Sequence, residues 1–160
     1  MSEGPSALAP LDVLWAFDQE AIDRRTGQSG KWKLLVVMGT APDGDDLILF
    51  RINSAAMTRR GPRPGSILIP RDPHHPFLDH DSYLFCGGPP VALTDAQLQA
   101  AMAGQAIAHR QGIVGRIHSS LIPSIRAAIE ASNMLPEAVR TLILGSLAQH
   151  VPPADCDGGA

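Results

Sequence analysis

The chain of 160 residues is poor in aromatic residues, in cysteine and in net charge. Aromatic residues make up 4% of the sequence, so the core must be built mainly from Leu, Ile, Val and Ala. The only cysteines, Cys86 and Cys156, are too few for a disulfide framework and predict reduced thiols in the cytoplasm. The net charge of −3 excludes a general attraction to nucleic acid, so any such site must be a local basic patch.

Long apolar runs and standard cofactor motifs are also missing. No segment approaches the roughly 20 apolar residues of a membrane-spanning helix, and the first residues lack the charged start and apolar stretch of a signal peptide. The sequence contains no phosphate-binding glycine loop, no HExxH zinc motif and no paired CxxC motif. These absences predict a soluble, cytoplasmic protein that contacts no membrane and uses no cofactor.

The length of the chain fits a single domain, because domains usually contain about 100–200 residues. Gly, Pro, Ala and Ser are concentrated in residues 1–10 and 150–160, which we expect to be flexible ends. We therefore expect one α+β domain over residues 11–149, of which the part 119–149 is helical.

The first half of the chain has the pattern of short strands separated by turns. The apolar run 32–38, the Asp43-Gly44 turn signal and the run 47–53 together predict a β-hairpin. Further strands are predicted at 13–17, 66–70 and 82–86. Strands this short, with loops this varied, favour a small and strongly bent barrel over a flat sheet.

The second half changes to the helical period of about 3.6 residues. Thr94 and Gln97 form a capping box, which predicts a helix through about residue 103. Gly112 and Gly115 are expected to break the segment that follows.

Two helices are predicted at the end of the domain. Ser119 or Ser120 is the expected cap of the first, which has Pro123 in its first turn and Asn133 at its expected end. Pro136 is the expected start of the second helix.

The segment RDPHHPFLDHDSY (71–83) combines histidines with aspartates. Such residues can bind a divalent metal or act as a general acid and base, but aspartates also form turns in ordinary polar loops. Adjacent residues of an extended chain point to opposite faces, so His80 can share a site with Ser82 but not with Asp81. A metal-dependent hydrolase is a further alternative, with ligands from His74, His75 and His80. We interpret the isolated histidines as ordinary surface or packed side chains: His109, His118 and His150.

Two other segments carry candidate binding residues. The most basic stretch has four arginines and no acid, which suits phosphate or an acidic peptide, although the same residues could keep an exposed edge soluble. These arginines are Arg59, Arg60, Arg63 and Arg71. The predicted hairpin adds polar residues near its strand ends, where sites of small barrels are often found. These residues are Lys31, Lys33, Arg51, Asn53 and Ser54, of which Lys33 and Arg51 could also be strand charges that face water.

The order of these segments resembles that of the PemK/MazF family of small toxins. PLDVLWAF, a polar loop and KWKLLVVM resemble the opening of that family, in which Gly-Asp starts a strand and Arg-Pro leads the next; Leu11-Asp12 stands at the Gly-Asp position. LILFRINS resembles the family's second hairpin strand, which ends in Thr or Ser. SYLFC and GRIHSSLIPSIRAAIEASNML resemble its late strand and C-terminal helix, so the resemblance covers roughly residues 10–135.

The resemblance implies an SH3-like barrel, a homodimer, metal-independent cleavage of single-stranded RNA, and an antitoxin whose acidic tail fills the RNA groove. In this reaction the 2′-hydroxyl of the RNA attacks the neighbouring phosphate, which requires a base, a cation and in-line positioning. The Arg-Pro position reads Lys31-Trp32-Lys33 here, and the Thr position falls on Asn53 or Ser54. A barrel that has lost catalysis and binds a protein or nucleic acid is the alternative that these departures leave open.

The candidate residues follow from the resemblance and from the local patterns together. The candidate catalytic residues are Lys33, Ser54, His80 and Ser82. The candidate RNA- or partner-binding residues are Lys31, Arg51, Arg59, Arg60, Arg63 and Arg71.

Overall fold

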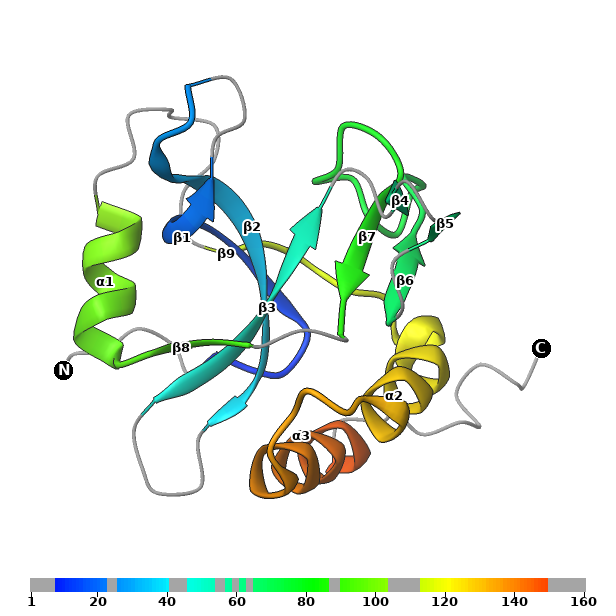
Figure 1. Ribbon diagram of the computed structural model, residues 1–160. Coiled ribbons are helices and arrows are strands. Elements are labelled where there is room, and N and C mark those ends of the chain that lie inside the picture. The colour runs from blue at the N-terminus through cyan, green and yellow to red at the C-terminus, as the bar shows by residue number, and fades with distance from the viewer. Residues whose placement is uncertain are drawn as a thin grey trace, which may run out of the picture.

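A computed structural model describes residues 8–22, 26–40, 46–53, 57–58, 61–62, 65–86, 90–103 and 113–149. These residues form a curled antiparallel sheet with helices packed on both of its faces (Figure 1), which confirms the predicted α+β class. Among the helices of these residues, none is long and apolar enough to cross a membrane.

The described part of the chain contains one large sheet and one small hairpin. The large sheet has the strand order β6-β7-β3-β2-β1-β9, and β8 pairs with β3 as well. Its strands are β1 (Asp12–Ile22), β2 (Ser29–Thr40), β3 (Leu47–Asn53), β6 (Ser66–Ile69), β7 (Ser82–Phe85), β8 (Val91–Leu93) and β9 (Ile113–Arg116). The small hairpin consists of β4 (Met57–Thr58) and β5 (Gly61–Pro62).

The centre of the sheet is buried on both faces. Along β2, Leu35 and Val37 pack in one apolar cluster, whereas Val36 and Met38 pack in another. Successive side chains of a strand point to opposite faces, so a strand covered on both sides needs an unbroken apolar run. This requirement explains why residues 35–38 do not alternate with polar residues.

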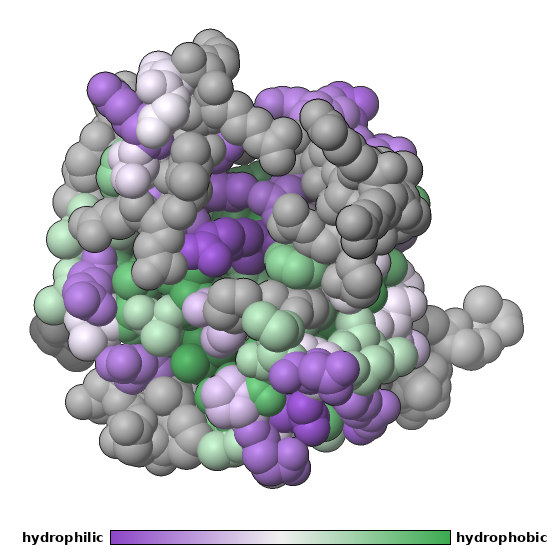
Figure 2. Space-filling view, in the orientation of Figure 1, coloured by the Kyte–Doolittle hydropathy of each residue, from purple (hydrophilic) through white to green (hydrophobic). Residues whose placement is uncertain are grey.

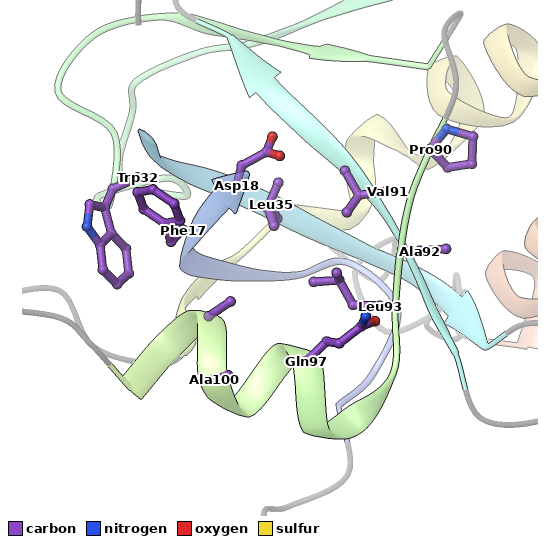
Figure 3. Close-up of a pocket in the computed structure, with 11 residues that line it drawn as sticks. Phe17, Asp18, Trp32, Leu35, Pro90, Val91, Ala92, Leu93, Gln97 and Ala100 are labelled. Carbon is purple, nitrogen blue, oxygen red and sulfur yellow. The ribbon is translucent and has the colours of Figure 1, made fainter. Parts of the chain in front are cut away.

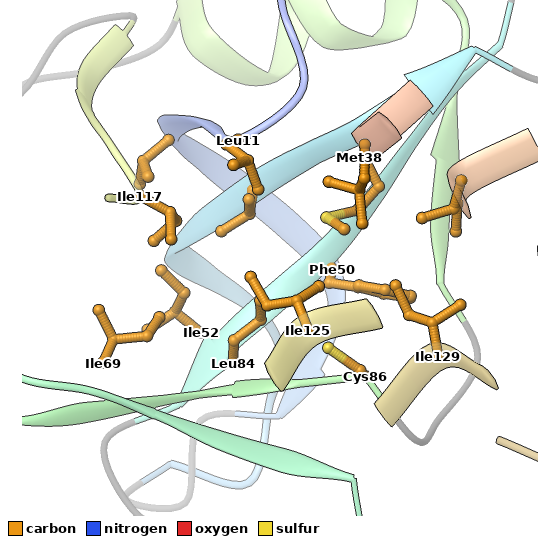
Figure 4. Packing of buried hydrophobic residues seen from close by; sticks show 14 of the residues in the cluster. Leu11, Met38, Phe50, Ile52, Ile69, Leu84, Cys86, Ile117, Ile125 and Ile129 are labelled. Atoms are coloured by element: carbon orange, nitrogen blue, oxygen red, sulfur yellow. The ribbon is translucent and has the colours of Figure 1, made fainter. Parts of the chain in front are cut away.

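Three helices of the described residues cover the two faces. α2 (Ile122–Ala131) and α3 (Glu137–Gln149) cover one face, where Ile125 and Ile129 pack in the same cluster as Phe50 (Figure 4). α1 (Asp95–Ala103) covers part of the other face through the fully buried Leu98.

Several predicted elements are confirmed by the structure. β2 and β3 form the expected antiparallel hairpin, with Leu35 opposite Arg51. The capping box also forms: the Thr94 N–H donates to Gln97 Oε1 at 2.9 Å, and the Gln97 N–H donates to Thr94 Oγ1 at 3.1 Å. These elements depend on local contacts, which short sequence patterns describe well.

The prediction that Gly115 interrupts the segment after the first helix is wrong, because Gly115 lies within β9 and pairs with β1. A Cβ atom at this position would overlap the ring of Phe77. Glycine is therefore required by a close approach inside a strand rather than by a turn. Gly112 lies outside the residues that the structure describes.

The cap predicted for the helix after β9 is also wrong. His118 caps a 3₁₀ turn over Ser119–Leu121, where its side chain accepts a hydrogen bond from the Ser120 N–H. α2 follows directly, with Leu121 as a cap without a side-chain hydrogen bond, and it ends at Ala131, before Asn133.

Candidate functional site

Lys33 lies at the centre of a polar row that crosses three strands. The β2–β3 pairing, continued two residues beyond Leu35 opposite Arg51, brings Lys33 level with Asn53, and Asn53 is in turn opposite Tyr83 of β7. Lys33 Nζ donates to Asn53 Oδ1 at 2.5 Å. The structure thus brings the predicted catalytic lysine to the end of β3, whereas Ser54 lies outside the described residues.

Arg51 forms a two-pronged ion pair with Asp18 of β1. Arg51 Nε donates to Asp18 Oδ2 at 2.5 Å, and Nη2 donates to Oδ1 at 3.2 Å. The Asp18 side chain is only 2% exposed, and this parallel geometry is the strongest form of a carboxylate–arginine contact. We call Asp18, Lys33, Arg51 and Asn53 the polar cluster.

Asp18 was absent from the candidates taken from the sequence. A signal was present, since this aspartate closes the otherwise apolar run VLWAF, and a carboxylate in such a strand needs a partner. The partner could not be identified, because Arg51 is 33 residues away along the chain. Lys31, the other lysine of β2, lies opposite Asp18 in the β1–β2 register.

Three aromatic side chains gather on the β1–β2 hairpin. The rings of Trp15 and Trp32 stack with centroids 6.1 Å apart, and Phe17 meets Trp32 edge to face at 5.8 Å. Phe17 is 36% exposed. A protein with only two Trp, one Tyr and four Phe therefore concentrates nearly half of its aromatic side chains in one hairpin.

A pocket of about 650 Å³ lies beside the polar cluster. Figure 3 shows Phe17 and Trp32 at one end, α1 along one side, and Asp18 with its carboxylate directed away from α1. Hydrophilic side chains also gather at the bottom of a hollow in the upper half of the face shown in Figure 2. The pocket volume of about 650 Å³ lies in the range of small-molecule sites, which is roughly 300–1,000 Å³.

The structure does not bring His80 and Ser82 together in one site. His80 is exposed and its Nδ1 lies 2.8 Å from the Asp81 carbonyl oxygen, whereas Ser82 is buried and donates to the His80 carbonyl oxygen at 3.1 Å. Ser82 shares a strand face with the core residue Leu84, and Tyr83 between them faces the polar row. Ser82 and Lys33 therefore project from opposite faces of the sheet.

Arg71 shapes the same loop. Its Nε donates to the Leu78 carbonyl oxygen at 3.1 Å, and its backbone N–H donates to Asp81 Oδ1 at 2.8 Å. The other arginines of the basic stretch lie outside the described residues: Arg59, Arg60 and Arg63.

His75 and His118 form a contact that their separation in sequence conceals. His75 is buried; its Nδ1 lies 3.0 Å from the Pro70 carbonyl oxygen, and its Nε2 accepts from the His118 N–H at 3.0 Å. This geometry fits a tautomer in which Nε2 accepts from the His118 N–H and Nδ1 donates to the Pro70 carbonyl oxygen. The rings of His74 and His118 are 3.8 Å apart, so His118 is a packed histidine, which is one of the two expectations from the sequence.

Two kinds of chemistry find little support among the described residues. No group of three or more His, Cys, Asp or Glu side chains is placed to hold a metal ion in this part of the chain. Burial raises the pKa of the Cys86 thiol to about 12, so Cys86 stays protonated near neutral pH and is a poor nucleophile.

Comparison of the sequence with known protein families and with curated proteins gives no match. The site is therefore interpreted from its own chemistry. The site combines two cations, a buried carboxylate and an amide with neighbouring aromatic rings. The remaining histidines, His109 and His150, lie outside the described residues.

Proposed function

We propose that this chain is a metal-independent endoribonuclease that binds single-stranded RNA at the polar cluster. The observation that carries the proposal is the position of Lys33, Arg51 and Asp18 next to a pocket with Phe17 and Trp32. Proteins that bind single-stranded nucleic acid combine cations for the phosphates with aromatic faces for the bases. This arrangement meets both requirements within one hairpin and the strand beside it.

The polar cluster has the groups that attack by a 2′-hydroxyl requires. Asp18 accepts the proton of the 2′-hydroxyl, whose oxygen forms a bond to the neighbouring phosphorus while the bond from phosphorus to the 5′-oxygen breaks. Lys33 donates a proton to the departing 5′-oxygen, and Arg51 stabilises the extra negative charge on the phosphate. The products are a 2′,3′-cyclic phosphate and a free 5′-hydroxyl.

The conformation of Leu11 supports the resemblance to the PemK/MazF family. Leu11 has a φ of +79°, a left-handed conformation that glycine adopts easily and that a bulky residue rarely adopts. It occupies the position at which the family has the Gly of Gly-Asp. On this proposal the curled sheet is a variant of the SH3-like barrel, the protein is a cytoplasmic homodimer, and an acidic antitoxin segment competes with RNA for the same cations.

One observation favours the alternative of a binding module without catalysis. The Asp18–Arg51 ion pair and the Lys33–Asn53 hydrogen bond link neighbouring strands, and such links can serve stability alone. A binding module predicts RNA or protein binding that weakens with rising salt and is not followed by cleavage.

The proposal is tested by incubating the purified protein with mixed single-stranded RNA, with and without EDTA. The variants are the Lys33→Ala, Ser54→Ala double variant and Arg126→Ala, a matched control that removes a cation from α2 on the other side of the sheet. We expect cleavage that survives EDTA, is lost in the double variant and is unchanged in the control. Thermal melting of each variant confirms that it is folded.

The other outcomes identify the alternatives. Cleavage that EDTA abolishes would move the chemistry to His74, His75 and His80. Absence of cleavage by folded wild-type protein, together with salt-sensitive RNA binding, would establish the binding module. Cleavage that persists in the double variant would exclude Lys33 and Ser54 as catalytic residues.

A further inference from the structure

We propose that Tyr83 is a stacking platform for one base of the RNA, on β7 and beside the polar cluster. The inference rests on the proposed function, since it assigns a place to the base whose phosphate the polar cluster binds. It adds a binding residue from β7, a strand that contributes nothing to the polar cluster itself.

Tyr83 continues the row of Lys33 and Asn53 onto the next strand. β7 lies between β3 and β6 in the sheet (Figure 1), and Tyr83 is opposite Asn53. Asn53 is also the residue that accepts the hydrogen bond from Lys33 Nζ. Paired residues of neighbouring strands project from the same face, with Cβ atoms about 4.5–5.5 Å apart. The tyrosine side chain therefore lies next to the amide that holds the lysine.

The face of β7 that carries Tyr83 lies outside the core. Ser82 and Leu84 are buried on the opposite face of β7, whereas Tyr83 between them is half-buried. Leu68, the partner of Tyr83 on β6, is 46% exposed, so solvent reaches this face of the sheet. A half-buried tyrosine beside an exposed leucine forms an apolar surface that a flat ring can cover.

The aromatic side chains outside the core lie around the polar cluster. Phe50 and Phe77 are buried in the main apolar cluster. All other aromatic side chains of the protein lie on the β1–β2 hairpin or on β7, the two neighbours of β3: Trp15, Phe17, Trp32, Tyr83 and Phe85. The cations for the phosphates thus have aromatic residues on both sides, as in sites that bind single-stranded nucleic acid.

The spacing places a phosphate and its own base on neighbouring groups of the protein. Two strand spacings separate the backbone of Lys33 from that of Tyr83, which is about 10 Å. Because the lysine side chain extends to Asn53, a phosphate at its Nζ lies within one nucleotide of the tyrosine ring. Stacking uses the flat face that every base has, so the platform holds a base without selecting among the four.

Tyr83 is the only tyrosine of the protein, so the full chain labelled at tyrosine gives the NMR ring signals of this residue alone. We would add a short oligodeoxyadenylate, which lacks the 2′-hydroxyl and is not cleaved in the proposed reaction. The expected result is a saturable upfield shift of the Tyr83 ring protons, caused by the ring current of the stacked base. Ring signals that stay in place, or that move without saturation, would overturn the proposal.

Two substitutions at position 83 isolate the contribution of the ring. Tyr83→Phe keeps the ring without the hydroxyl, whereas Tyr83→Leu keeps only apolar volume. We expect Tyr83→Leu to weaken the binding of a fluorescent oligodeoxyadenylate about tenfold, and Tyr83→Phe to remain within about twofold of the wild type. Equal affinities of the two variants, at equal melting temperatures, would overturn the stacking contact.

Met134→Ala is the matched control for these substitutions. Met134 is 59% exposed and lies between α2 and α3, which cover the opposite face of the sheet. Its truncation removes an exposed apolar side chain far from the polar cluster and should leave the affinity unchanged. A loss of affinity equal to that of Tyr83→Leu would show a general effect of apolar truncation and overturn the proposal.

Cleavage of single-stranded RNA separates this inference from the proposed function. A stacking residue binds the substrate and the transition state alike, so we expect Tyr83→Leu to raise KM about tenfold with kcat unchanged. Cleavage with an unchanged KM in Tyr83→Leu would leave a ribonuclease and overturn the stacking platform. A saturable shift of the Tyr83 ring, without RNA cleavage by the wild type, would leave the platform and overturn the ribonuclease.

Discussion

At the scale of the residue, Leu11 combines two demands that conflict. Its side chain is 2% exposed within the main apolar cluster, and its backbone has a φ of +79°. The conformation is held by neighbours, because the Leu11 N–H donates to the Val37 carbonyl oxygen and the Leu11 carbonyl oxygen accepts from the Ile117 N–H. The structure thus tolerates an unfavourable backbone angle in exchange for a buried leucine.

This conflict predicts that glycine at position 11 gives a more stable protein than alanine, which is the reverse of the order at an ordinary strand position. Leu11→Ala and Leu11→Gly both lose the leucine side chain, so their difference isolates the backbone. We expect Leu11→Gly to be more stable than Leu11→Ala by about 1 kcal/mol, because left-handed backbone costs non-glycine residues about that much. Urea denaturation of both variants measures the difference in the free energy of unfolding.

Leu14 provides the matched control for this prediction. It lies three residues further along the chain, inside β1, and is fully buried. Among the described residues it is not one of those with a positive φ. At position 14 the alanine variant should be the more stable one, since glycine in a strand costs roughly 0.5–1 kcal/mol relative to alanine. The same order at both positions would contradict the strained conformation of Leu11.

At the scale of the element, α1 depends on its first turn. The reciprocal hydrogen bonds between Thr94 and Gln97 satisfy two backbone N–H groups that a helix start would otherwise leave unpaired. Apart from Leu98, most of the helix is exposed or half-buried, so packing alone holds it weakly. The capping box therefore also holds the wall of the pocket.

Removal of the cap should loosen α1 without unfolding the domain. We expect Thr94→Ala to cost about 1 kcal/mol and to raise amide hydrogen exchange across residues 95–103. Thr94→Ser keeps the hydroxyl and should restore the exchange rates. Unchanged exchange in Thr94→Ala would show that the packing of Leu98 is sufficient.

At the scale of the whole molecule, His75 connects two ends of the sheet. The strand order places β6 at one edge and β9 at the other. His75 belongs to the loop after β6, and the His118 N–H that it accepts follows β9. This single ring thus bridges the two edges of the curled sheet, and both of its nitrogens are engaged.

Loss of this bridge should weaken the whole fold. We expect His75→Ala to lower the free energy of unfolding by about 3 kcal/mol, because it leaves the Pro70 carbonyl and the His118 N–H without their partner. His80→Ala, at an exposed position in the same loop, should change stability by less than about 0.5 kcal/mol. Thermal or urea denaturation compares the two variants, and equal stabilities would exclude the bridging role.

The sequence by itself determined the local elements of this protein. The β2–β3 hairpin, the capping box of α1 and the α+β class follow from periodicity, turn residues and side-chain caps, all of which act over a few residues. The same local patterns drew attention to Lys33 and Arg51, which the structure places in the polar cluster.

Only the tertiary structure decided which distant residues meet. Asp18 pairs with Arg51, His75 accepts a hydrogen bond from His118, and Gly115 leaves space for Phe77. The neighbouring sequence of each residue does not indicate its partner. Such contacts depend on how the sheet curls and on which strand lies next to which. They arise from the packing of the whole chain, since burial and strand pairing are not properties of any single segment.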